Sequence, residues 1–144
     1  MQGFQDVVLD DKYRLRIPSK FRNEIGNNFV IFQGTDECLN IMSTSAFERF
    51  KAPLMNIPHN DRVARSAARA ILGTVDIPEE DNQGRFVISS ELRAIAGIEK
   101  KVRLIGFLDT LEVWSAEKVV EIDFAKPGSV ARAADILEER DINF

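Results

Sequence analysis

Residues 10–22 read DDKYRLRIPSKFR, and residues 81–93 read DNQGRFVISSELR. A shift of 71 residues aligns the two stretches, and six of the 17 positions from Asp10 to Gly26 are then identical. Average residue usage predicts about one identity by chance. The period is too long for a solenoid, so the sequence indicates a duplicated module. We expect a first repeat over residues 1–72 and a second over residues 73–144.

The match continues beyond these stretches after one inserted residue. The further identical pairs are Val30 with Val102, Gly34 with Gly106, Leu39 with Leu111, and Ser43 with Ser115. A module of about 70 residues is marginal for a hydrophobic core of its own. The two repeats are therefore expected to share one core.

The residue pattern predicts an α+β protein with the same order of elements in each repeat. Strands are expected at 4–9, 14–17, 29–32 and 39–42, and again at 74–77, 85–88, 102–105 and 111–114, with polar turns at 10–13 and 81–84. Short helices should begin near Ser19 and Ser90 and end at Gly26 and Gly97, where glycine suits a left-handed cap. Further helices are expected from Ser45, over 61–72, and from Ser115 to before Pro127. A last helix is expected over 129–140, and its apolar residues lie on one face that can dock.

The composition restricts the classes of protein to consider. The single cysteine excludes an intrachain disulfide and a cysteine-cluster zinc site, and it favours the cytoplasm, as does the lack of a signal peptide. No apolar run reaches the ~20 residues that span a bilayer, so no membrane partner is expected. The net charge of −4 argues at first against nucleic acid, but residues 10–22 carry a local excess of three positive charges. Composition alone favours ordinary surface charge.

Residues for catalysis are missing from the sequence. His59 is the only histidine and lies in a turn-like stretch, and Cys38 is expected to be a buried residue at the end of a strand. No phosphate-binding glycine loop and no complete calcium loop occur. We therefore expect no enzyme activity, cofactor, metal or small-molecule substrate.

The most informative motif is Asp-x-x-x-Arg, which occurs as Asp10 to Arg14 and as Asp81 to Arg85. In each copy the carboxylate can accept hydrogen bonds from turn amides and orient the arginine. A planar guanidinium can then donate to guanine edges or phosphates. A local salt bridge that only holds the turn explains the same spacing, and the motif alone does not decide between the two.

Both stretches resemble the MraZ family of the AbrB/SpoVT swapped-hairpin superfamily. Residues 10–22 resemble its first signature and residues 81–93 its second repeat, with residues 102–106 and 111–115 matching later landmarks of that repeat. The resemblance covers nearly the whole chain and is weakest after about Phe124. It implies two tandem swapped-hairpin AbrB-like modules that form one intertwined barrel with flanking helices.

The resemblance also implies a function. It predicts a cytoplasmic, nucleoid-associated, sequence-specific transcriptional regulator that binds direct repeats of double-stranded DNA in the promoter of the division and cell-wall gene cluster, including its own gene. Copies are expected to assemble into an octamer-like ring. The DNA-binding residues expected are Asp10, Lys12, Arg14, Arg16, Asp81, Gln83 and Arg85. Possible phosphate or subunit contacts are Lys20, Arg22 and Arg93.

Some residues depart from the family pattern. Tyr13 stands where the family has glycine, and Ser89 stands where it has proline. The second loop is acidic, so the first repeat is expected to supply most of the DNA affinity. In the alternative, the chain is a ring- or dimer-forming interaction module whose arginine loops make salt bridges between subunits. Trp114 is expected to lie in the core or at a subunit interface rather than to stack on bases.

Overall fold

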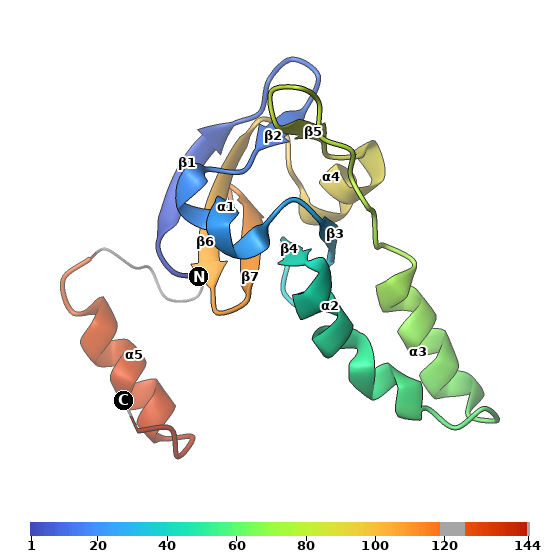
Figure 1. The fold of residues 1–144 in the computed structure, drawn as a ribbon. Helices are drawn as coiled ribbons and strands as arrows, with labels where there is room; N and C mark the ends of the chain where they lie inside the picture. Colours follow the sequence, from blue (N-terminus) through green and yellow to red (C-terminus); the bar gives the residue numbers. More distant parts are fainter. Residues whose placement is uncertain (119–125, 144) are drawn as a thin grey trace.

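The computed structural model describes residues 1–118 and 126–143 and shows a mixed α+β fold (Figure 1). The first repeat contains β1 (Phe4–Val8), β2 (Arg14–Arg16), α1 (Ser19–Ile25), β3 (Phe29–Gln33), β4 (Leu39–Ser43), α2 (Thr44–Lys51), the 3-10 helix η1 (Ala52–Asn56) and α3 (Arg62–Leu72). The second contains β5 (Arg85–Val87), α4 (Ser90–Ala96), β6 (Lys101–Phe107), β7 (Thr110–Ser115) and α5 (Ser129–Glu138).

The main sheet is antiparallel and has five strands in the order β1-β6-β7-β4-β3. Each repeat contributes one hairpin, β3–β4 from the first and β6–β7 from the second, and these hairpins join where β4 pairs with β7. The sheet is therefore continuous across the two repeats.

The first strand of each repeat pairs with the hairpin of the other repeat. β1 lies along β6, with Phe4 opposite Ile105. The corresponding stretch of the second repeat reaches β3, but only Asp76 pairs there, through reciprocal hydrogen bonds of 2.9 and 2.8 Å with Ile31. The strand expected at 74–77 is thus a single bridge. Pro78 follows directly and has no amide with which to continue a ladder.

A second, smaller sheet forms from β2 and β5, again one strand from each repeat. Leu15 lies opposite Phe86, and both side chains are almost completely buried. Because alternate residues of a strand face opposite sides, their neighbours on β2 and β5 face outward.

One core cluster holds residues from both repeats, which confirms that the repeats share a core. It includes Leu9, Leu15, Ile17, Phe21, Ile25, Phe29, Ile31, Leu39 and Ile41 from the first repeat, and Phe86, Ile88, Leu92, Ala96, Ile98, Val102, Leu104, Leu111 and Val113 from the second. The small size of each repeat predicted this arrangement.

The short helices α1 and α4 begin where the sequence predicts. Ser89 accepts a hydrogen bond from the Leu92 amide at 3.3 Å and caps α4, which ends at Gly97 in the left-handed conformation. Gly26 also has a positive φ, but its ψ of −160° lies outside the left-handed helical region that we expected.

The segment α2–η1–α3 forms an arm that extends from the sheet (Figure 1). It is attached through aromatic contacts, with the Phe32 ring 5.2 Å from Phe47 and 5.1 Å from Phe50. Ser43, rather than Ser45, caps α2 by accepting from the Ala46 amide, because β4 ends directly at the helix start. The helix expected over 61–72 forms as α3, and Asp61 caps it by accepting from the Ala64 amide.

Two further predictions concern the end of the second repeat. Trp114 is half-buried on the outer face of β7, where its Nε1 donates to Glu112 at 3.2 Å. Trp114 therefore lies outside the core, because Leu111, Val113 and Ser115 occupy the inner face of that strand, and the subunit interface stays as its predicted position. After Ser115, residues 116–118 form a turn, and the rest of the helix expected there falls at 119–125, outside the described residues.

Cys38 is 1% exposed at the start of β4, as expected, and burial raises the pKa of its thiol. Within residues 1–118 and 126–143, no helix is long and apolar enough to cross a membrane. The same residues contain no group of three or more potential metal ligands.

The shared core makes a specific prediction for Phe86, which is 1% exposed and packs 5.2 Å from the Phe29 ring of the other repeat. We expect Phe86→Ala to lower the free energy of unfolding by about 3–5 kcal/mol, because it leaves a cavity between the repeats. Val87→Ala is the matched control, since Val87 is the next residue of β5 and is 50% exposed. It should change stability by less than about 0.5 kcal/mol. Urea denaturation measures both, and equal effects would contradict the shared core.

Candidate nucleic-acid interface

The loop between β1 and β2 is organised by one carboxylate. Asp10 Oδ1 accepts hydrogen bonds from the amides of Lys12 and Arg14, both at 2.9 Å. The Tyr13 amide donates to the Asp10 carbonyl at 3.0 Å and closes the turn. An aspartate side chain that binds nearby backbone amides in this way fixes a turn without requiring tertiary contacts.

The loop before β5 repeats this geometry in the second repeat. Asp81 Oδ1 accepts from the amides of Gln83 and Arg85, both at 2.9 Å, and Gly84 donates to the Asp81 carbonyl at 3.0 Å. The same motif therefore forms the same turn twice. This duplication shows that the local sequence, and not one particular environment, dictates the turn.

The two turns meet in a network of four charged side chains. Asp10 Oδ2 accepts from Arg14 Nε at 2.6 Å, and Asp81 Oδ2 accepts from Arg85 Nε at 2.9 Å. Across the network, Arg14 Nη1 lies 3.6 Å from Asp81 and Arg85 Nη1 lies 3.9 Å from Asp10. The pairing of β2 with β5 places the turns side by side and makes the cross contacts possible.

The guanidinium groups remain accessible within this network. The side chains of Arg14 and Arg85 are 22% and 30% exposed, so neither is deep in the protein. Nε of each arginine donates to its own aspartate, which orients the planar group, and Nη1 approaches the aspartate of the other repeat. The salt bridge that holds each turn is thus present, and each arginine side chain is still partly exposed.

The carboxylates of the network are held in the charged form. Burial alone raises the pKa of Asp10, but hydrogen bonds from Arg14 and from the Lys12 amide outweigh it and lower the pKa to about 2. For Asp81, the hydrogen bond from the Arg85 amide is the main cause of a lowered pKa. Both aspartates are therefore ionised at neutral pH.

Tyr13 occupies the turn position that is glycine in the second repeat. Its φ of 59° matches the 73° of Gly84, so the tyrosine adopts a conformation that L-residues normally avoid. Its ring is held between two cations of the second repeat, with the Arg93 guanidinium 3.5 Å and the Lys100 Nζ 3.8 Å from the ring centroid. Lys100 also donates to the Asp10 carbonyl at 2.8 Å. These contacts fasten the first turn to the second repeat.

The residues beside the turns differ in charge between the repeats. Lys12 and Gln83 are exposed at equivalent positions, and Arg16 is exposed where the second repeat has Val87. Arg16 also lies beside the second turn, since it is the register partner of Arg85. The additional positive charge at the surface therefore comes from the first repeat.

The three remaining basic residues predicted from the sequence make contacts within the chain. Lys20 Nζ donates to the Phe4 carbonyl at 2.6 Å, and Arg93 Nε donates to the Ile88 carbonyl at 3.0 Å. Arg22 forms a two-point ion pair with Glu80, one contact of which is 2.9 Å. Glu80 is one of the acids that make the second loop acidic, so Arg22 offsets part of that charge.

Sequence reasoning missed Lys100, and it counted Glu80 among the acids of the second loop without predicting its contact with Arg22. Lys100 is 90 residues from Asp10, and Glu80 is 58 residues from Arg22. Neither residue is part of the repeated Asp-x-x-x-Arg motif. Only the pairing of the repeats brings them to the turns, so no local signal could have identified them.

The ring contacts of Tyr13 give a stability prediction. We expect Tyr13→Ala to be more destabilising than Tyr13→Gly, by about 1 kcal/mol, because alanine keeps the unfavourable φ while glycine relieves it. Both variants lose the two cation–π contacts, each worth about 0.5–2 kcal/mol, so both should be less stable than the wild type. Thermal or urea unfolding measures the order. A glycine variant more stable than the wild type would show that the ring contacts do not hold the turn.

The low pKa of Asp10 gives a pH prediction. The unfolded chain takes up a proton near the ordinary value of 3.8, whereas the folded chain does so only near 2. The stabilisation by Asp10 is therefore fully present above about pH 4 and is lost as the pH falls toward 2. Unfolding free energies measured across this range should fall less steeply for Asp10→Asn than for the wild type. Parallel curves would contradict the assigned hydrogen bonds.

Comparison with known proteins places these features in a family. Residues 1–70 and 71–119 both match the model of the family described as "MraZ protein, putative antitoxin-like". A "Transcriptional regulator MraZ" of Finegoldia magna is 41% identical over 110 residues, which cover 76% of this chain and 77% of the relative.

Other relatives extend the similarity along the chain. The protein of the same name from Thermoanaerobacter pseudethanolicus is 35% identical over 142 residues, or 99% of both chains. That from Leuconostoc mesenteroides is 38% identical over 115 residues and 80% of both chains. With the family model matched in both repeats and relatives aligned over almost their full length, the chain belongs to the MraZ family.

Proposed function

We propose that the chain is a sequence-specific DNA-binding transcriptional regulator, not an enzyme, and that its paired Asp-x-x-x-Arg turns contact the DNA. The observation that carries the proposal is the joining of Arg14 and Arg85 at one partly exposed surface, each oriented by its own aspartate. A pre-oriented guanidinium is suited to bidentate contacts with guanine or phosphate. The relatives' name, transcriptional regulator, supports the same function.

The proposed residues have distinct roles. Arg14 and Arg85 contact bases or phosphates, and Asp10 and Asp81 hold them. Lys12, Gln83 and Arg16 lie around them at the exposed surface and add contacts to the DNA backbone. Lys20, Arg22 and Arg93 act at most as secondary contacts, since their donors are used within the chain.

Binding by one copy should be weak, because the aspartates of the network neutralise its arginines. The surface excess comes from Lys12 and Arg16, and the neighbouring Asp11 reduces it. Several copies that bind direct repeats together would multiply weak contacts. We therefore propose that the chain self-associates, in an octamer-like ring, and binds repeated sites.

The resemblance to the MraZ family supports finer parts of the proposal. The first is a swapped-hairpin arrangement of the two repeats, which span residues 1–72 and 73–144. The second is a cytoplasmic and nucleoid-associated location. The third is control of the division and cell-wall gene cluster through the protein's own promoter. The exchange of β1 and of Asp76 between repeats supports the first of them. The alternative, that the arginine turns serve as salt bridges between subunits, has less support, because their aspartate partners lie in the same chain.

The difference between the turns gives the test of DNA binding. We expect Lys12→Gln, which makes the first turn resemble the second, to weaken binding to the upstream promoter, and Gln83→Lys to strengthen it. Arg14→Ala should cost more affinity than Arg85→Ala, with a loss of about tenfold or more for a base-contacting arginine. Fluorescence anisotropy at several salt concentrations measures both effects, and a lost phosphate contact should lower the salt slope by about one.

Arg49→Ala is the control, since Arg49 is an exposed arginine of the arm, on α2. It should leave affinity unchanged. Equal affinities for all five variants would rule out the turns as the DNA contact. Equal losses for Arg14→Ala and Arg85→Ala would contradict the larger role of the first repeat.

A further inference from the structure

The arm formed by α2, η1 and α3 carries an open apolar groove. Leu54, Met55 and Ile57 line one side, and Ala68 and Leu72 of α3 line the other. Met55 is 85% exposed and Leu72 is 39% exposed, so the described part of the chain leaves this surface largely uncovered. Contiguous exposed apolar surface usually marks a contact site.

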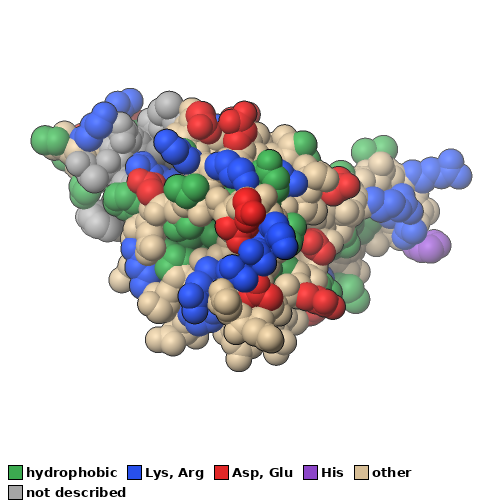
Figure 2. Space-filling model, turned by 90° about the horizontal axis from the view of Figure 1, so that it is seen from above, with side chains coloured by type: hydrophobic (Ala, Val, Ile, Leu, Met, Phe, Trp, Pro, Cys, Tyr) green, Lys and Arg blue, Asp and Glu red, His purple; other side chains and the backbone are tan. Residues whose placement is uncertain are grey.

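The rim of the groove is basic. Arg65 and Arg69 line it, and Arg62 precedes them on α3 at a spacing of three and then four residues, which places all three near one side of the helix. Figure 2 shows Lys and Arg side chains gathered beside the histidine at the far right of the molecule. Arg65 Nη1 lies 3.4 Å from His59 Nδ1, so the histidine belongs to the same cluster. A partner for this groove should be apolar and acidic.

The helix α5 has those two properties. None of its residues is buried, and Val130 is 70% exposed. Val130, Ala134 and Leu137 recur at helical spacing and form one apolar face. Glu138, four residues after Ala134, lies at one edge of that face, and Asp135 lies beside Glu138 but further from the face.

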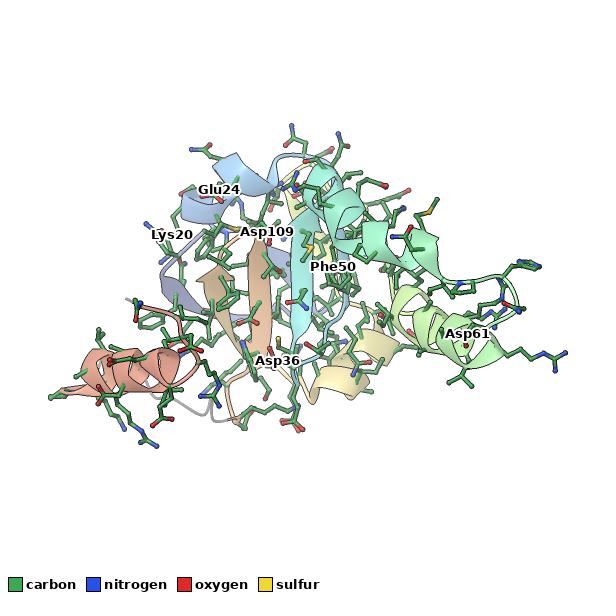
Figure 3. The ribbon with its side chains drawn as sticks, turned by 90° about the horizontal axis from the view of Figure 1, so that it is seen from below. Lys20, Glu24, Asp36, Phe50, Asp61 and Asp109 are labelled. Carbon is green, nitrogen blue, oxygen red and sulfur yellow. The ribbon has the colours of Figure 1, made fainter. Side chains whose placement is uncertain are left out.

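The dimensions and positions of the two surfaces also fit. Ten residues of α5 and eleven of α3 give helices of about 15 and 16 Å, so one helix can lie along the other. Figures 1 and 3 place α5 and the tip of the arm, marked by Asp61, at opposite ends of the molecule. A groove at one end and a helix at the other join copies head to tail, and such contacts form rings when they close.

We propose that α5 of one copy docks in the α2–η1–α3 groove of a second copy. The apolar face of α5 covers the groove floor, and its acidic edge faces Arg65 and Arg69. This inference rests on the self-association proposed above and does not depend on the DNA contact. A second arm in the groove would place arginines against arginines. DNA would leave the apolar floor uncovered, and the Asp-x-x-x-Arg turns lie at the far side of the sheet from the arm (Figure 1).

Trans cross-linking tests the docking directly in the full chain without DNA. Cys38 is buried, so an introduced cysteine is the main accessible thiol. We expect an oxidised mixture of Ala68→Cys chains and Ala134→Cys chains to form disulfide-linked dimers that contain one chain of each kind. Arg132→Cys is the matched control, because Arg132 is exposed on the side of α5 opposite the apolar face, and it should cross-link several-fold less.

Two results would overturn the proposal. One is that a separate variant carrying both Ala68→Cys and Ala134→Cys forms the disulfide only within its own chain, which would place α5 in its own groove. The other is equal cross-linking of Arg132→Cys and Ala134→Cys. Light scattering of the wild type distinguishes failure of this contact from failure of self-association. If the wild type assembles but the cross-link does not form, self-association stands and this contact is wrong. If the wild type is a monomer, both proposals are wrong.

Charge reversal provides a second, independent readout. Arg69→Glu should reduce the molar mass of the assembly, and Glu138→Arg in the same chain should restore it, since each groove then faces an opposite charge again. An unchanged mass for Arg69→Glu together with weaker DNA binding would assign the basic rim to DNA and overturn the proposal. A reduced mass that Glu138→Arg does not restore would also contradict it.

Discussion

The antiparallel pairing of β2 with β5 is the contact on which the remaining features depend. It joins strands that lie about 70 residues apart, buries Leu15 against Phe86, and brings the two preceding turns together. Because the residues of a strand alternate between faces, the same pairing that fills the core directs Arg14, Arg16 and Arg85 outward. The stability of the core and the geometry of the surface therefore have one origin.

The four charged residues of the turns show how a partly exposed surface can be kept rigid. Each aspartate satisfies two backbone amides and one guanidinium, and each guanidinium also approaches the aspartate of the other repeat. Such pre-orientation lowers the entropy lost when an arginine binds a ligand. It also neutralises the arginines, which is the reason we propose that adjacent charges and several copies contribute to the affinity. The network accounts for the fixed geometry of the surface.

The sequence predicted what is local and what repeats. The turns at Asp10 and Asp81 and the start of α4 follow from side-chain-to-backbone hydrogen bonds within four residues, and these formed as predicted. A shared core was also predictable, because neither repeat is large enough to form its own. The identity of the exchanged strands was not predicted from residues alone, since strand pairing between repeats has no local signature.

The incorrect predictions have the same cause. For Trp114 the core was one of two predicted positions, with a subunit interface as the other, but Trp114 lies on the outer face of β7, outside the core. Residues 74–77 have a strand-like composition, yet only Asp76 pairs, because Pro78 follows directly. The contacts of Lys100 with Tyr13 likewise depend on tertiary structure and have no counterpart in the second repeat.

The structure of the chain bound to its upstream promoter DNA is the most direct test of this account. We predict that Arg14 and Arg85 of one subunit both lie within about 3.2 Å of acceptor atoms on the same stretch of duplex, with each Nε still donating to its own aspartate. A duplex bound at another face, with both guanidinium groups paired only to Asp10 and Asp81, would contradict the central claim.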